Sequence, residues 1–258
     1  MEIIIKNMSA GYAKTEILHN IDLEIKAGDK VFIGGPNGSG KTTLLRVIAG
    51  IIPHKGEVLV NGKEISSMKR KEAAQLISLM PQTSEIYFPY TVYETVLLGT
   101  YASSGSVFAG IKASDISYAL KCMEDCGITD LKDRHLDELS GGQLQRVLLA
   151  RTFAQRSPFL FLDEPGNNLD IKYRAELCDR LNEWTCEKTN GIDNSLVCIF
   201  HDLEQARRCC NRAVMMKDGR IVFDGDINEA MRKDMLMEVY DYDVNSYISA
   251  GNPGRGQQ

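Results

Sequence analysis

Residues 35–42 have the types and spacing of a loop that binds phosphate groups. Glycines let the backbone curl so that several N–H groups point at one anion. A lysine adds a mobile positive charge for the β- and γ-phosphates, and the hydroxyl after it is a ligand for Mg²⁺. The segment therefore predicts a site for a nucleoside triphosphate. The pattern G-x-x-x-x-G-K-[ST], extended by one threonine, is filled by Gly35, Pro36, Asn37, Gly38, Ser39, Gly40, Lys41, Thr42 and Thr43.

Two elements must position this loop. The apolar run 30–33 before it is typical of a buried strand, and residues 44–49 after it are typical of a helix. The N-terminus of such a helix carries about half a positive charge, which favours a bound anion. The alternative, a glycine-rich turn that fits the pattern by chance, is disfavoured because the strand and the helix are both in place.

Two carboxylates follow the apolar run 159–162. A strand this apolar is typical of a parallel sheet that is buried on both faces, and ligands bind at the carboxyl ends of such strands. Asp163 could hold Mg²⁺ next to Thr42, and Glu164 could orient or deprotonate a water in line with the γ-phosphate. By itself such a run is more often followed by a helix cap, so the interpretation depends on the phosphate loop upstream.

A second helix start that can receive an anion is predicted at residues 140–143. Ser140 is a typical N-cap residue, which is its ordinary structural role. The two glycines and the glutamine that follow, Gly141, Gly142 and Gln143, leave backbone N–H groups and a helix dipole facing outward.

The composition limits the classes to which the protein can belong. A formal net charge of −5 disfavours a nucleic-acid partner, since such proteins bind phosphates mainly through lysine and arginine. No apolar run approaches the ~18 residues of a membrane span, and the N-terminus does not read as a signal peptide. We therefore expect a cytosolic protein that could reach a membrane through partners. Its seven cysteines follow no zinc spacing and are expected to be reduced thiols.

The order of the elements indicates an α/β fold with a helical insertion. The insertion is predicted from three helical patterns in the middle of the chain. A polar loop is expected at 189–194, an exposed loop at 102–106 and a disordered tail at 251–258. Strands are expected at 2–6, 18–25, 30–33, 57–60, 76–80, 159–163 and 196–200, a hairpin at 213–224, and helices at 44–49, 68–74, 92–98, 115–125, 142–153, 171–188 and 203–210, with two short helices after the hairpin.

Together these motifs resemble those of the ATPase subunits of ATP-binding cassette (ABC) transporters over nearly the whole chain. Residues 35–42 are similar to the family's Walker A loop, 159–164 to its Walker B strand and 139–146 to its signature sequence. Further matches are Tyr12, where the family stacks an aromatic ring on adenine, Gln82 of the Q-loop, Leu169 and Asp170 of the D-loop, and the switch histidine His201. Taken singly, these residues also fit a surface tyrosine, a turn residue, a helix cap and a core-edge histidine.

The resemblance implies a P-loop NTPase (RecA-like) core with a small antiparallel β-subdomain and an inserted helical subdomain. It divides one domain, 1–250, into the core with its β-subdomain (1–88 and 156–225), the helical subdomain (89–155) and C-terminal helices (226–250). Two copies would pair head to tail, each lending residues 140–143 to the ATP of the other. Glu164 would polarise the water, His201 would contact the γ-phosphate and Asp170 would couple the two sites. Mg²⁺ would be held by Thr42, Gln82 and Asp163.

Two segments are similar to those of importers of metal chelates: 88–99, and 237–244 near the C-terminus. That class implies import of an iron-siderophore, haem or cobalamin-like compound, a separate permease at the membrane, and an extracytoplasmic substrate-binding protein. The chain would then lie at the cytoplasmic side of the membrane. It departs from the family's usual pattern at Gly166, Asn167 and Asn168 in the D-loop, at Phe200 and at Thr100.

Two alternatives remain open at the level of sequence. A soluble ABC ATPase of a non-transport assembly, such as iron–sulfur cluster biogenesis, would carry nearly identical motifs, and segment 88–99 favours transport over it. A scaffold that binds ATP without turnover is disfavoured because Glu164 and His201 are both present.

Overall fold

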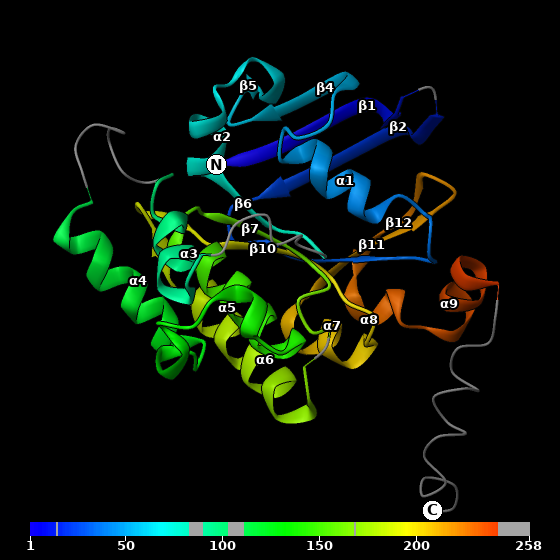
Figure 1. Ribbon diagram of the computed structural model, residues 1–258. Coiled ribbons are helices and arrows are strands. Elements are labelled where there is room, and N and C mark those ends of the chain that lie inside the picture. Colours follow the sequence, from blue (N-terminus) through cyan, green and yellow to red (C-terminus); the bar gives the residue numbers. More distant parts are fainter. Residues whose placement is uncertain (14, 83–89, 103–110, 168, 242–258) are drawn as a thin grey trace, which may run out of the picture.

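The computed structural model describes residues 1–13, 15–82, 90–102, 111–167 and 169–241 (Figure 1). Its centre is a six-stranded sheet in the order β12-β11-β3-β10-β7-β6. Neighbouring strands from β6 to β11 run parallel, and β12 pairs antiparallel with β11. The strands are β3 Lys30–Gly34, β6 Ile77–Met80, β7 Phe159–Asp163, β10 Ser195–Ile199, β11 Arg212–Lys217 and β12 Arg220–Asp226.

This sheet explains how distant parts of the sequence meet. Strands β7 and β10 are buried along their whole length, as expected for parallel strands covered on both faces. Parallel strands end at the same edge, so the residues that follow β3, β6, β7 and β10 gather there. These residues are the phosphate loop, Gln82, Glu164 and His201.

A second, antiparallel sheet covers one side of the molecule, with α1 between the two sheets (Figure 1). One apolar cluster joins all three layers, with Ile3 and Val58 from the antiparallel sheet, Leu44 from α1, and Phe161 from the central sheet. The elements of this side are β1 Glu2–Tyr12, β2 Thr15–Lys26, β4 His54–Val60, β5 Lys63–Glu64, α1 Lys41–Ile48 and α2 Arg70–Leu76.

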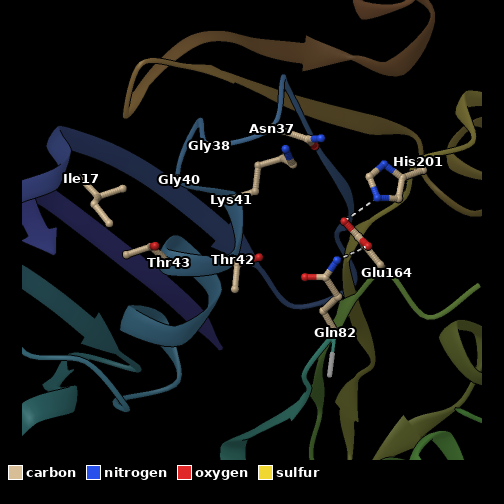
Figure 2. Close-up of a pocket in the computed structure, with 10 residues that line it drawn as sticks. All are labelled: Ile17, Asn37, Gly38, Gly40, Lys41, Thr42, Thr43, Gln82, Glu164 and His201. Atoms are coloured by element: carbon tan, nitrogen blue, oxygen red, sulfur yellow. Dashed lines mark hydrogen bonds and ion pairs between the residues drawn. The ribbon is translucent and has the colours of Figure 1, made fainter. Parts of the chain in front are cut away.

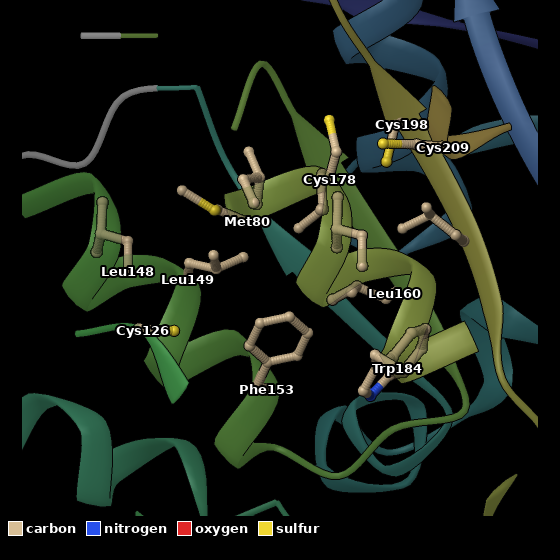
Figure 3. Packing of buried hydrophobic residues seen from close by; sticks show 14 of the residues in the cluster. Met80, Cys126, Leu148, Leu149, Phe153, Leu160, Cys178, Trp184, Cys198 and Cys209 are labelled. Atoms are coloured by element: carbon tan, nitrogen blue, oxygen red, sulfur yellow. The ribbon is translucent and has the colours of Figure 1, made fainter. Parts of the chain in front are cut away.

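The other face of the central sheet is covered by helices. Figure 3 shows their packing, in which Phe153 and Trp184 lie with ring centroids 6.2 Å apart, near Leu160 of the sheet. Gly99 allows α3 and α5 to approach closely, because a Cβ atom there would lie 2.2 Å from the carbonyl oxygen of Arg151. The helices are α3 Val92–Gly99, α4 Ala113–Asp125, α5 Gly141–Ala154, α6 Ile171–Cys186 and α7 Leu203–Cys209, followed at the C-terminal side by α8 Ile227–Ala230 and α9 Lys233–Tyr240.

The expected α/β organisation agrees with this arrangement, and one local prediction was wrong. Residues 189–194, expected as a loop, contribute to a short hairpin of β8 Lys188–Thr189 and β9 Ile192–Asp193. Asn190 and Gly191 both have positive φ, which is the geometry of a tight hairpin turn, and Asn-Gly is the usual sequence for it. The predicted tail and most of the predicted loop at 102–106 lie outside the described residues.

Two further details differ from the sequence expectations. The first two strands are longer than expected, because irregularities in register let β1 continue to Tyr12. Helix α1 begins at Lys41 rather than at residue 44. Among the described residues, none of the helices has the length and apolar character that a membrane span requires.

Candidate nucleotide site

The loop between β3 and α1 is shaped by close packing and by backbone conformations that favour glycine. Gly35 has φ of +135°, and a Cβ atom on it would lie 2.0 Å from the carbonyl oxygen of Met216. Gly40, with φ of +99°, is the N-cap of α1. The loop therefore ends directly at a helix N-terminus, where the helix dipole favours an anion.

Lys41 reaches back across the loop that precedes it. Its Nζ donates hydrogen bonds to the carbonyl oxygens of Gly35 and Pro36, both at 2.8 Å. Burial lowers the pKa of Lys41, and the negative charges of Glu164 and Asp163 oppose this by favouring the charged form. The ammonium group is thus held inside the loop, beside two carboxylates.

The loop opens into a cavity of about 380 Å³ (Figure 2). Ile17 of β2 contributes one wall. The side chains of Gln82, Glu164 and His201 enter from the ends of three other strands and face the loop. The phosphate loop and α1 supply Asn37, Gly38, Gly40, Lys41, Thr42 and Thr43.

Glu164 is the centre of the polar contacts in this cavity. Its Oε1 lies 2.7 Å from Nε2 of His201, and its Oε2 accepts a hydrogen bond of 2.6 Å from Nε2 of Gln82. The side-chain amide of Asn167 also donates to Oε2. Three elements therefore converge on one carboxylate that is 8% exposed.

Asp163 has the surroundings of a metal ligand. It is buried, and the Thr42 hydroxyl donates a hydrogen bond to its carboxylate. Burial raises the pKa of Asp163, and the charge of Glu164 adds to this, whereas the Thr42 hydrogen bond opposes it. Its Oδ1 has no hydrogen-bond partner among the described residues. A buried carboxylate oxygen without a donor, beside a hydroxyl, fits the oxygen ligands that Mg²⁺ prefers.

The predicted signature residues form a helix start away from this cavity. Ser140 is the N-cap of α5, its Oγ accepts from the N–H of Gln143, and Oε1 of Gln143 accepts from the N–H of Ser140. This is a capping box, so the ordinary structural role predicted for Ser140 is confirmed. Gly141 is exposed and Gly142 half-buried, and none of residues 140–143 is among the residues that line the described cavity.

Other predicted residues also lie outside the cavity lining. Tyr12 is 42% exposed, and its hydroxyl accepts a hydrogen bond from Arg46. Asp170 is the N-cap of α6, with Oδ1 2.9 Å from the N–H of Tyr173. Ser39 is buried, and its Oγ has no hydrogen-bond partner among the described residues. Asn168 of the D-loop is outside the described residues.

Three residues that contact the site were not expected from the sequence. Asn167 was noted only as a departure in the D-loop. Gln145 of α5 donates to the main-chain oxygen of Glu164, and the hydroxyl of Tyr240 accepts from the N–H of Gly35. The signals for the last two were weak, since Gln145 lies in the signature segment 139–146 but outside the residues 140–143 that were expected to act, and Tyr240 lies near the C-terminus.

Comparison with known proteins identifies the family. A model of the ABC transporter family matches residues 18–167. This chain therefore belongs to the ABC transporter family, and the resemblance seen in its sequence is confirmed. As an ABC ATPase, it binds and hydrolyses ATP.

Individual relatives extend the similarity to most of the chain. YvrA of Bacillus subtilis, an uncharacterized ABC transporter ATP-binding protein, is 36% identical, and the match covers 96% of this chain but 55% of YvrA. The petrobactin import ATP-binding protein YclP of Bacillus subtilis is 32% identical over 93% of both chains. The ferric enterobactin transport ATP-binding protein FepC of Escherichia coli is 34% identical, over 91% of this chain and 85% of FepC.

A solved structure supports the fold and the chemistry. The dimeric, post-hydrolysis state of the ATP-binding cassette MJ0796 bound to ADP and Pi has a TM-score of 0.77 and 26% identity, over 87% of this chain and 98% of that one. The expected P-loop NTPase fold is confirmed by this similarity.

Proposed function

We propose that the chain is the ATP-hydrolysing subunit of an importer. The imported compound would be an iron chelate (siderophore), haem or a cobalamin-like compound, and it would cross the membrane through a separate permease. The observation that carries the catalytic part is that Lys41, Glu164 and His201 line one cavity. The import part is supported by the petrobactin protein YclP, which matches this chain over 93% of both lengths. An extracytoplasmic substrate-binding protein would deliver the compound.

Each residue has a role in this proposal. The phosphate loop and Lys41 bind the phosphates of ATP, with Tyr12 at the adenine. Thr42, Asp163 and Gln82 hold Mg²⁺, which when bound neutralises phosphate charge. Glu164 orients the attacking water and accepts its proton, and His201 contacts the γ-phosphate. In the structure, Oε2 of Glu164 accepts from Gln82 and Asn167, whereas Oε1, among the described residues, contacts His201 alone and keeps acceptor capacity for a proton.

The site is completed by a second copy in this proposal. Residues 140–143 present an exposed helix start away from the described cavity of their own chain. A head-to-tail pair with two-fold symmetry would bring this start to the partner's ATP, and would do so twice. Asp170, at the start of α6, would link the two sites.

The permease would contact the helical part of the chain. Tyr90, Leu98, Tyr101 and Leu120, on and around α3 and α4, are large apolar side chains that are 39–45% exposed. Exposed apolar side chains that gather in one region mark contact surfaces. We propose that residues 89–155 form the unit that carries this surface, and that the chain lies at the cytoplasmic side of the membrane.

The catalytic assignment is tested by Glu164→Gln, which keeps the size of the side chain but removes the base. We expect hydrolysis to fall by about 100-fold or more, because a positioned general base contributes that much. ATP binding should persist, and the variant should form a dimer with ATP in size-exclusion chromatography. Release of phosphate at the parental rate would refute the role of Glu164.

The transport assignment is tested with a permease that purifies together with this chain. Vesicles that contain the assembled complex and its binding protein should accumulate an iron-siderophore, haem or cobalamin only with ATP inside. If the protein purifies instead with a soluble assembly complex and never with a permease, the importer proposal is wrong.

A further inference from the structure

Gln145 is a buried polar side chain to which the proposed mechanism gives no role. It lies on α5, two residues after Gln143, and is 5% exposed. Its Nε2 donates a hydrogen bond of 3.1 Å to the main-chain carbonyl oxygen of Glu164. Buried amides need such partners, but this partner is the peptide of the proposed catalytic carboxylate.

The backbone of Glu164 is in a conformation that must be held in place. Its φ is +56°, in the left-handed region that a residue with a long side chain seldom adopts without support. Its N–H donates to the carbonyl oxygen of Ile199 at the end of β10, at 3.0 Å. Its carbonyl oxygen accepts from the N–H of Asn167 at 3.2 Å as well as from Gln145. The peptide is therefore held by β10, by the following turn and by α5.

We propose that Gln145 is a positioning residue for ATP hydrolysis. Its hydrogen bond maintains the left-handed backbone that directs the Glu164 carboxylate into the nucleotide cavity. This inference rests on the proposed role of Glu164 in orienting water. A small displacement of that carboxylate would cost a large part of the rate, because proton transfer requires close alignment.

The same bond connects two functional ends within one subunit. Helix α5 is continuous from Gly141 to Ala154, and its start is the segment proposed to meet the partner's ATP. A shift of this helix on engagement of the partner changes the position of Gln145, and with it the peptide of Glu164. Through Gln145, occupancy of one ATP site would align the carboxylate that acts on the other.

The variant Gln145→Met tests this inference, since methionine has nearly the same length and no donor. We expect kcat to fall on the order of 10- to 100-fold. Affinity for a fluorescent ATP analogue, measured without Mg²⁺, should stay within about twofold, because the phosphate loop is unchanged. A second variant, Gln145→Glu, replaces the donor with an acceptor that faces the carbonyl oxygen, and should lose at least as much activity.

Gln155→Met is the matched control. The Nε2 atom of Gln155, at the C-terminal end of α5, donates to the carbonyl oxygens of Ala74 and Ile77 at 2.7 and 2.9 Å. This substitution removes a comparable glutamine away from Glu164, so it should lower the Tm but leave kcat unchanged. If Gln155→Met lowers kcat as much as Gln145→Met, the effect is general destabilisation and the inference fails.

Glu164→Gln separates this inference from the proposed function. Hydrolysis at the parental rate in Glu164→Gln would overturn the role of Glu164 and the inference with it. An inactive Glu164→Gln beside a Gln145→Met variant that keeps parental kcat would overturn the inference alone.

Discussion

At the scale of single residues, the site consists of charged side chains held close together by hydrogen bonds. Lys41 is bound by carbonyl oxygens of its own loop, and Glu164 by three donors. These contacts hold the positively charged Lys41 and the negatively charged Glu164 in the lining of one cavity. Substitutions that remove single charges should therefore have different effects on ATP affinity, on the rate of hydrolysis and on the Tm, depending on which residue is changed.

Lys41→Ala should remove ATP binding. The substitution deletes the positive charge nearest the expected phosphates, and a contact of this kind contributes enough free energy to weaken binding on the order of 100-fold. Titration with a fluorescent ATP analogue measures this. Lys172→Ala is the control, because Lys172 pairs with Glu176 on the surface of α6. Equal affinity in Lys41→Ala and the parent would contradict the phosphate-loop assignment.

Asp163→Asn should stabilise the nucleotide-free protein while impairing hydrolysis. The carboxylate is buried, one of its oxygens has no donor among the described residues, and burial raises its pKa, so its negative charge is costly without a bound cation. We expect the Tm to rise by roughly 2–4 °C, the shift that about 1 kcal/mol produces in a chain of this size. The dependence of hydrolysis on Mg²⁺ should move to higher concentration. A lower Tm in the variant, measured by calorimetry with chelator, would show that the carboxylate is stabilising.

At the scale of elements, the phosphate loop is supported from the C-terminal part of the chain. The hydroxyl of Tyr240, on α9, lies 3.1 Å from the N–H of Gly35, and burial raises the pKa of this tyrosine. Helix α9 is in turn attached to β11, where Lys217 donates to the carbonyl oxygen of Glu238 and to Asp241. The N–H of Gly219, in the turn after β11, donates to the carbonyl oxygen of Ser39. Both ends of the loop thus depend on residues far along the sequence.

Tyr240→Phe should therefore weaken ATP binding with little effect on folding. It removes the acceptor for the N–H of Gly35 but keeps the ring, and a hydrogen bond of this type contributes about 1 kcal/mol, or roughly fivefold in affinity. Isothermal titration would measure the change. Tyr93→Phe, on a partly buried tyrosine of α3, is the control. Unchanged affinity in Tyr240→Phe would show that α9 does not support the loop.

At the scale of the whole molecule, two apolar clusters lie on opposite faces of the central sheet. One includes α1 and the antiparallel sheet, and the other includes α3 to α9. Six of the seven cysteines are buried in these layers, whereas Cys186, at the end of α6, is exposed. Burial raises the pKa of Cys122 to about 12, which makes its thiolate scarce at neutral pH.

A thiol reagent should therefore modify the native protein once. At pH 8 we expect one rapid equivalent per chain, at Cys186, and six further equivalents only at the rate of unfolding. Cys186→Ser should abolish the rapid phase and leave ATP hydrolysis unchanged. Several rapid equivalents in that variant would show that the packing of the helical face is looser than described.

The sequence by itself determined the motifs, the class of fold and the chemistry of the site. The reason is physical: the loop at 35–42 needs glycines next to one another in the chain, and the strand at 159–163 is apolar because both its faces are buried. Such local requirements are visible in residue types and spacing. The Asn-Gly turn at 190–191 was equally local, and was missed by reading the segment as polar.

Only the tertiary structure decided which residues support that chemistry from a distance. The contact of Gln145 with the peptide of Glu164 depends on how α5 crosses the end of β7, and that of Tyr240 with Gly35 on how α9 folds back beside β11. Neither pairing has a fixed spacing, because long-range contacts follow from the packing of whole elements. The same packing leaves residues 140–143 outside the lining of the described cavity of their own chain. The number of residues between these segments in the sequence does not determine that separation.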